Sequence, residues 1–144
     1  MDCFFCRFLA GEESEWNREA DVVLRTPRTT AFVSPRAWPG NAGNAIVIPN
    51  AHVPDLESCP DDLLAELYTA AKRVAVAMRA AYGCEGTSTR QHNGVAAGQE
   101  VDHLHVHVFP RHAGDRLYER DAEHGFAPPE ERAGYAARLR DAMR

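Results

Sequence analysis

Apolar residues recur with the spacing of an amphipathic helix through the middle of the chain. Between Leu63 and Tyr82 they fall three or four positions apart, which places them on one helical face. Gly83 follows directly and suits a left-handed helix end. Ser58 and Asp61 have the spacing of a capping box at the start. We therefore predict one long central helix.

Short apolar runs on both sides of this helix are typical of β-strands. Three strands, a long helix and two further strands do not alternate as a doubly wound sheet requires. The order favours an α+β fold, with an antiparallel sheet of about five strands and helices on one side. The predicted strands are Val22–Arg25, Thr30–Val33, Ala45–Ile48, Thr87–Gln91 and Leu104–Phe109.

The end of the chain is less regular. Residues 112–129 show no clear periodicity, and we predict a long loop that either covers a site or lies loosely on the surface. Residues 130–143 again carry apolar side chains at helical spacing and predict a C-terminal helix. Because no repeat or linker divides the sequence, we expect a single domain over residues 1–144.

Composition and charge narrow the class of protein. The 144 residues are 44% hydrophobic and 26% charged, as in an ordinary globular domain. The net charge of −5 disfavours nucleic acid as a partner. No run approaches the roughly 18 apolar residues of a membrane helix, and the first residues lack a signal-peptide pattern. We expect a cytoplasmic protein without membrane contact.

Two of the four cysteines form a Cys3-x-x-Cys6 motif. In a cytosolic chain this spacing indicates metal binding or redox chemistry more than a structural disulfide. Cys59 and Cys84 are isolated, and we interpret them as small apolar core residues.

Three histidines alternate with apolar residues near the end of the predicted sheet: His103, His105 and His107. In a strand they share one face while the residues between them pack against the core. The outer two then lie about 13 Å apart, so all three cannot bind one metal ion. A neutral imidazole can act as a nucleophile near neutral pH, and the row therefore suggests acid–base or covalent chemistry on an anion.

A loop of small residues, 92–99, leads into this strand. Its backbone N–H groups are accessible enough to form an anion-binding nest. The loop lacks both the P-loop and the dinucleotide-binding spacings, and a plain turn between two strands is the alternative interpretation.

Residues 98–111, which read Gly-Gln-Glu-Val-Asp-His-Leu-His-Val-His-Val-Phe-Pro-Arg, resemble the signature of the histidine triad (HIT) family of nucleotide hydrolases and transferases. The likeness extends to Cys3-x-x-Cys6, to Ala31-Phe32, to residues 45–52 and to the long helix. It covers residues 1–118, whereas 119–144 are variable. The resemblance implies a HIT-like fold and a homodimer.

The resemblance also implies a mechanism. His105 would attack the α-phosphorus of a nucleotide and form a nucleotidyl-histidine intermediate, which water then hydrolyses. The backbone carbonyl of His103 would hold the other ring nitrogen of His105. His107 and the backbone at Gly98 would stabilise the phosphoryl oxygens, and Gln99 would contact the bridging oxygen or the leaving group. The family requires no catalytic metal.

A histidine at position 107, where the uridylyltransferase branch has glutamine, favours a hydrolase of nucleoside phosphoramidates or dinucleoside polyphosphates. The implied substrate is a purine nucleotide. The residues implied to contact the base include Phe5, Phe8 and Phe32, for which ordinary core packing is the alternative interpretation. The residues implied to bind the nucleotide are Phe5, Phe8, Phe32, Ser34, His92, Asn93, Gly98 and Gln99.

Family members with an N-terminal Cys-x-x-Cys imply a zinc site. Its four ligands here would be Cys3, Cys6, His52 and His103. A tetrahedral site filled by four protein ligands is structural. A redox pair is the alternative for the two cysteines.

The chain departs from the family pattern near the expected site. Asn44 stands where many members have histidine, Ser34 replaces a ribose-binding acid, and Glu100 replaces a hydroxyl residue. The insert 36–42 has no counterpart in the best-known branches. These departures leave one alternative to a hydrolase with a covalent intermediate, namely a zinc-stabilised nucleotide-binding or scaffold protein with little turnover. A second alternative is a metal-dependent hydrolase that uses His103 and His105 as a chelate for the metal.

Overall fold

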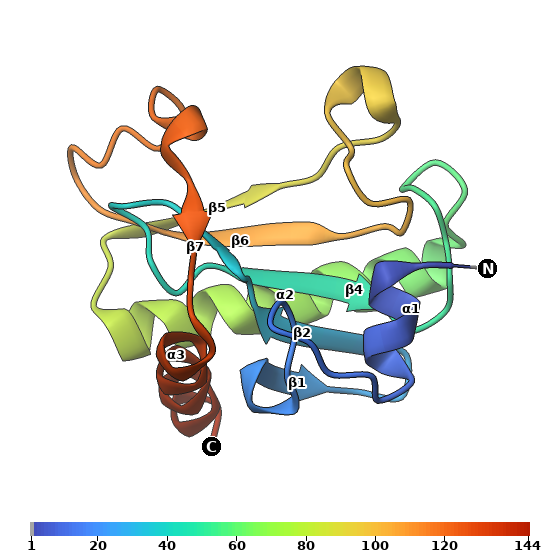
Figure 1. The fold of residues 1–144 in the computed structure, drawn as a ribbon, viewed down its shortest axis with the longest axis horizontal. Coiled ribbons are helices and arrows are strands. Elements are labelled where there is room, and N and C mark those ends of the chain that lie inside the picture. Colours follow the sequence, from blue (N-terminus) through green and yellow to red (C-terminus); the bar gives the residue numbers. More distant parts are fainter. Residues whose placement is uncertain (1) are drawn as a thin grey trace.

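A five-stranded antiparallel sheet forms the centre of the protein in the computed structural model, which describes residues 2–144 (Figure 1). The strand order is β1-β2-β4-β6-β5, and every neighbouring pair is antiparallel. The α+β fold and all five predicted strands are confirmed. The strands are β1 (Val22–Arg25), β2 (Thr29–Val33), β4 (Ala45–Pro49), β5 (Gly86–Arg90) and β6 (Val106–Arg111).

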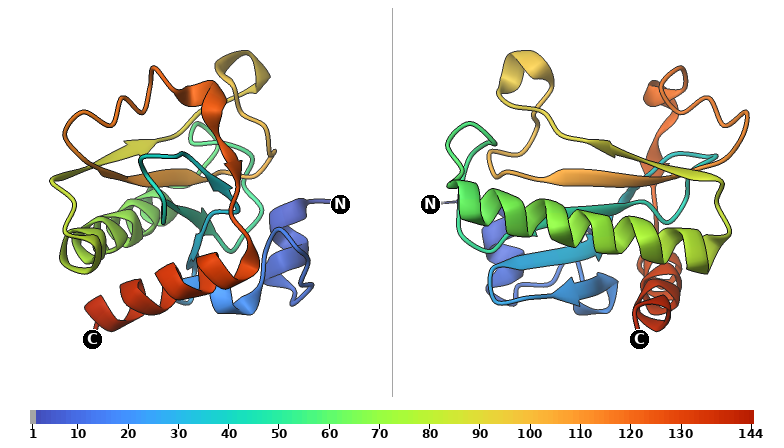
Figure 2. Two further views of the ribbon diagram at one scale, coloured as in Figure 1. Left: turned by 60° about the vertical axis from the view of Figure 1, so that its left-hand side comes forward. Right: turned by 180° about the vertical axis from the view of Figure 1, so that it is seen from behind.

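The long helix α2 (Asp61–Tyr82) lies across one face of the sheet (Figure 2). It buries its predicted apolar face, and it ends at Gly83 in the left-handed conformation, with φ 64°. The predicted capping box is wrong. Ser58 instead donates its backbone N–H and its hydroxyl to Asp55 Oδ1, at 2.9 and 2.8 Å, and the helix begins after Pro60.

Two further helices pack around the sheet. The C-terminal helix α3 (Pro129–Ala142) lies beside α2 and confirms the predicted helix. The short helix α1 (Phe4–Leu9) covers part of the opposite face, where Phe5 and Phe8 join an apolar cluster with Phe32. Across the residues that the structure describes, no helix combines the length and apolarity needed to cross a membrane.

The histidine segment enters the sheet later than predicted, because β6 begins at Val106 and not at Leu104. The backbone N–H of Leu104 donates to the carbonyl of Val53 at 2.7 Å and not to a neighbouring strand. The predicted alternation nevertheless holds. Leu104 and Val106 lie in the core beneath α2, whereas His103 and His105 contact Phe5 on the opposite face.

Part of the predicted loop 112–129 is ordered as a small second sheet. Strand β7 (Gly125–Phe126) pairs with β3 (Arg36–Ala37), which lies in the insert. A 3-10 helix (Asp121–Glu123) precedes it. Because each strand has only two residues, the sequence shows no alternation to reveal them. The pairing brings the C-terminal segment beside the histidine face of the main sheet.

Candidate active site and metal site

A cleft of about 360 Å³ opens on the histidine face of the sheet. His105 and His107 form part of its wall together with Phe5 from α1. The insert contributes Trp38, and the segment after β6 contributes the 3-10 helix. Segments that are distant in sequence therefore meet around His107, which lies in β6, and His105, which directly precedes this strand.

The hydrogen bonding of His105 fixes which ring nitrogen carries the proton. Its Nδ1 lies 2.7 Å from the backbone oxygen of His103. Because a carbonyl oxygen only accepts, Nδ1 must donate, and the lone pair of the neutral ring is left on Nε2. Burial lowers the pKa of His105 below its usual value, despite this hydrogen bond. The ring is therefore a neutral imidazole at pH 7, with one nitrogen free for nucleophilic chemistry.

His107 lies deeper in the cleft. Its ring stacks on Phe109, with centroids 5.7 Å apart, and lies 5.2 Å from the ring of His105. Burial lowers the pKa of His107 to about 3, so this ring is also neutral at pH 7. Among the described residues, its Nδ1 is buried and has no hydrogen-bond partner. It can therefore supply a hydrogen bond to a ligand oxygen but no fixed positive charge.

Five of the eight residues that the resemblance assigns to the nucleotide line the cleft, namely Phe5, Ser34, His92, Gly98 and Gln99. The structure does not bring Phe8 and Phe32 there. Both lie in the apolar cluster between α1 and the sheet, and Phe32 is completely buried. Asn93 accepts hydrogen bonds from the Leu56 N–H and from Gln91, each at 2.8 Å. It therefore braces the loop beside the cleft.

Gln99 is held entirely by backbone groups. Its Oε1 accepts from the N–H of Gly94 at 2.6 Å, and its Nε2 donates to the carbonyls of Pro54 and Val101 at 2.6 and 3.0 Å. These bonds shape the small-residue loop that carries Gly98. Gln99 thus orients the backbone N–H groups of this loop along the cleft.

Two of the residues that depart from the family pattern form hydrogen bonds to the backbone of Arg36 in β3. Ser34 Oγ accepts from the backbone N–H of Arg36 at 3.1 Å, and Asn44 Nδ2 donates to the carbonyl of Arg36 at 2.9 Å. The third, Glu100, forms an ion pair with the Arg36 side chain, with Oε2 and Nη2 2.7 Å apart. All three residues therefore position Arg36 at the cleft.

Sequence reasoning missed several residues of the cleft wall. They come from the insert, from the end of β5 and from the segment after β6, none of which carries a recognisable motif. The only available signal was that the insert contains a tryptophan two residues after an arginine. Among the missed residues are Arg36, Trp38, Arg90, Asp121 and His124.

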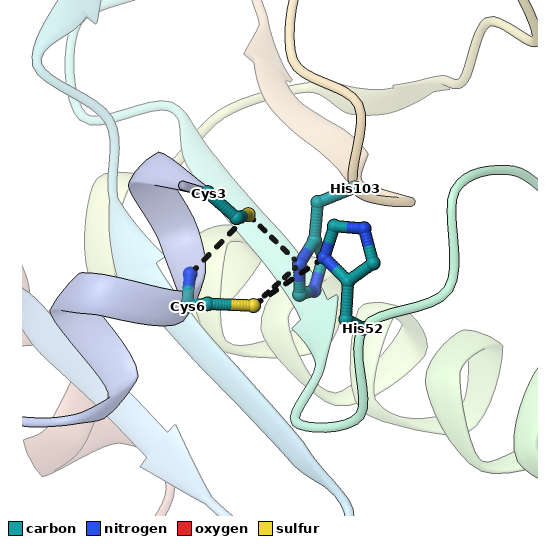
Figure 3. Close-up of side chains that lie close together, drawn as sticks. All are labelled: Cys3, Cys6, His52 and His103. Atoms are coloured by element: carbon teal, nitrogen blue, oxygen red, sulfur yellow. Dashed lines mark hydrogen bonds between the residues drawn. The ribbon is translucent and has the colours of Figure 1, made fainter. Parts of the chain in front are cut away.

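The four predicted metal ligands converge beside the cleft (Figure 3). Their ligand atoms all lie within 4.8 Å of one another. Cys3 Sγ is 3.5 Å from His103 Nδ1, and Cys6 Sγ is 3.4 Å from His52 Nδ1 and 3.6 Å from His103 Nδ1. Sulfur and nitrogen ligands around a tetrahedral zinc ion lie about 3.5 Å apart. The residues therefore fit zinc.

The hydrogen bond at the other ring nitrogen of His103 also agrees with a zinc site. Its Nε2 lies 2.8 Å from the carbonyl of Pro49, so Nε2 donates and Nδ1 keeps the lone pair that a metal needs. Nδ1 of His103 faces the two cysteines and Nε2 is bound to Pro49, so neither nitrogen is free for a second metal ion. This arrangement argues against a catalytic metal chelated by His103 and His105 together.

Comparison with known proteins identifies the family of the chain. Residues 15–114 match the HIT domain. An uncharacterized HIT-like protein of Methanocaldococcus jannaschii is 33% identical over 113 residues, which are 78% of this chain and 81% of the relative. An adenosine 5′-monophosphoramidase of Saccharomyces cerevisiae is 32% identical over 109 residues, which are 76% of this chain and 62% of the relative.

A solved structure extends the comparison to nearly the whole chain. The crystal structure of a zinc-bound histidine triad family protein from Mycobacterium smegmatis has a TM-score of 0.80 and 28% sequence identity, and it covers 99% of this chain and 94% of that one. The chain belongs to the histidine triad family, as its motif predicts.

Proposed function

We propose that the protein hydrolyses purine nucleotides at the α-phosphate, through a nucleotidyl intermediate on His105. The substrate class is a nucleoside phosphoramidate or a dinucleoside polyphosphate. The 2.7 Å hydrogen bond from His105 Nδ1 to the carbonyl of His103 carries the proposal, because it leaves Nε2 as a nucleophile in the cleft. The relationship to a yeast phosphoramidase supports the same chemistry.

In the first step, the Nε2 lone pair of His105 forms a bond to the α-phosphorus. The bond from phosphorus to the leaving nitrogen or oxygen breaks, and the leaving group departs with that electron pair; a leaving amine also takes up a proton from solvent. In the second step, water attacks the phosphorus and the P–N bond breaks. This returns neutral imidazole, releases the nucleoside monophosphate and gives a proton to solvent. His107 and the loop N–H groups near Gly98 would stabilise the phosphoryl oxygens in both steps.

A trapping experiment tests this function. The protein is mixed with excess adenosine 5′-phosphoramidate or diadenosine triphosphate, quenched in base within milliseconds to seconds, and analysed by intact-protein mass spectrometry. We expect an adenylyl adduct on the wild type and on His112→Ala, an exposed histidine outside the cleft. We expect none on His105→Ala. Turnover with an adduct on another residue contradicts the mechanism, and nucleotide binding without turnover supports a binding protein instead.

We also propose that the zinc ion is structural. Helix α1 has only six residues, which is too short to be stable alone. Zinc held by Cys3 and Cys6 would fasten α1 to the sheet through His103 and thereby fix the position of Phe5 in the cleft wall. Homodimer formation remains a prediction from the family resemblance, and a cytoplasmic location remains a prediction from the sequence pattern.

Removal of one zinc ligand is expected to lower stability. Cys6→Ala should lose the single bound zinc ion per chain, measured by metal analysis, and should unfold roughly 10 °C lower. The matched control is Cys84→Ala, which also removes a thiol but lies in the core beneath α2. It should keep its zinc. Full zinc content in Cys6→Ala would contradict the assigned ligands.

A further inference from the structure

Arg90 is held rigidly next to the reacting histidines. It is the cross-strand partner of His107 in the pairing of β5 with β6, so the two side chains lie on the same face of the sheet. Its guanidinium carbon lies 5.2 Å from the ring of Trp38 and 5.0 Å from that of Phe109. These contacts restrict the side chain before any ligand binds.

The hydrogen-bonding capacity of Arg90 is only partly used. Its Nη1 donates to Asp121 Oδ1 at 3.0 Å. Within the part of the chain that the structure describes, its Nε is buried and has no partner. A buried donor without a partner carries a free-energy cost, which a ligand oxygen at that position would remove. Arg90 is thus prepared for an additional acceptor.

Arg36 provides a second guanidinium in the same cleft. It is positioned by Ser34 and Asn44 and forms an ion pair with Glu100. Arg36 and Arg90 both line the cleft together with His107, and their positive charges add to the burial and to His105 in lowering the pKa of His107. A guanidinium group stays charged at every physiological pH, so these arginines supply fixed positive charge beside His107.

The acidic partners of both arginines are on the solvent side. The side chains of Glu100 and Asp121 are 63% and 59% exposed, whereas that of Arg90 is only 19% exposed. Ion pairs with such exposed carboxylates are weak. An incoming anion can therefore replace the carboxylates, while Arg90 remains fixed between its aromatic neighbours.

We propose that Arg90 and Arg36 form a subsite for an anionic leaving group, so that the protein prefers nucleotide anhydrides over phosphoramidates of neutral amines. An α-phosphate in an ester and anhydride linkage carries one negative charge, and His107 and the Gly98 loop already offer it hydrogen bonds. Two guanidinium groups are better matched to a second anionic group attached to it. This proposal rests on the proposed function, because it specifies the substrate of the same site.

The test compares kcat/KM for diadenosine triphosphate and for adenosine 5′-phosphoramidate. Arg90→Gln should lower the value for the triphosphate by roughly 30-fold, the effect of one lost charge-assisted contact, and that for the phosphoramidate by less than about threefold. Asp121→Asn should act in the opposite direction and lower KM for the triphosphate by about threefold, because it frees Arg90 from its competing carboxylate.

Arg138→Gln is the matched control. Arg138 also stacks on aromatic rings, those of Tyr82 and Tyr135, but does not line the cleft, so neither substrate should be affected. The proposal is overturned if Arg90→Gln lowers both substrates equally, if it lowers neither, or if the wild type prefers the phosphoramidate.

Failure of the proposed function gives a different result. If the wild type cleaves neither substrate, the subsite is judged by equilibrium binding of ADP and AMP. Loss of ADP affinity in Arg90→Gln, with AMP affinity unchanged, supports the subsite even without turnover. Equal affinities of the wild type for the two nucleotides contradict it.

Discussion

Replacement of His105 by alanine is expected to reduce kcat/KM by on the order of 10⁴-fold or more, because it removes the nucleophile of the proposed mechanism. The ring lines the cleft, and its Nδ1 bond to the His103 carbonyl directs the lone pair to Nε2. The proposed mechanism assigns this covalent bond to His105 alone. Steady-state kinetics with either substrate class measures the loss.

Two controls separate this effect from misfolding. His107→Ala should retain the nucleophile and lose roughly 10²- to 10³-fold, the usual effect of one removed donor to a developing oxyanion. His112→Ala should behave as the wild type, since it lies outside the cleft. If His105→Ala folds, keeps its zinc and retains more than about a hundredth of the activity, His105 is not the nucleophile.

Replacement of Arg132 by methionine is expected to lower the free energy of unfolding by about 3–5 kcal/mol, measured by chemical denaturation. Arg132 is completely buried and donates Nε to Asp21 Oδ2 at 3.0 Å. It also donates to the carbonyls of Ala127 and Glu15, at 2.6 and 2.8 Å. The variant would leave a buried carboxylate and two carbonyls without these partners.

An exposed arginine in the same C-terminal region provides the control. Arg144 pairs with Asp141 at 3.2 Å, but the side chains are 79% and 69% exposed. Arg144→Met should change the free energy of unfolding by less than about 0.5 kcal/mol. Similar stability changes in the two variants would show that the Asp21–Arg132 pair does not hold the C-terminal helix to the 3-10 helix Glu19–Asp21, which precedes β1.

Arg132 also explains why the C-terminal segment belongs to the site. The residue lies in α3, and its bond to the Ala127 carbonyl fixes the chain directly after β7. Trp38 donates from Nε1 to the backbone oxygen of Asp121 at 3.0 Å, which holds the 3-10 helix against the insert. The variable segment therefore forms one wall of the cleft and is not a loose surface loop.

The sequence pattern predicted those features of the fold that depend on neighbouring residues, and it did not by itself predict contacts between residues far apart in the chain. The strands, the long helix and the alternation around His105 follow from the local spacing of apolar side chains, so the pattern alone predicts them. The convergence of Cys3, Cys6, His52 and His103 could be inferred only through the family motif, because no local rule joins residues so distant in sequence.

The phenylalanines show what the sequence alone cannot predict. Phe5 and Phe32 are equally apolar, but Phe5 lies at the edge of its cluster and lines the cleft, whereas Phe32 lies beneath it in the sheet. Hydrophobicity indicates burial in both cases and cannot distinguish a cleft wall from a core. Only the packing of α1 on the sheet decides which ring faces a ligand.

By itself, the amino-acid sequence determined the fold class, the main secondary structure and the histidine row, because each is encoded by short-range periodicity or by a contiguous motif. The tertiary structure alone decided that Arg90, Arg36 and Asp121 meet beside that row. Their meeting depends on the two-residue pairing of β3 with β7 and on the Arg90–His107 register of β5 with β6. Such contacts between distant segments are set by packing, which leaves no periodic trace along the chain.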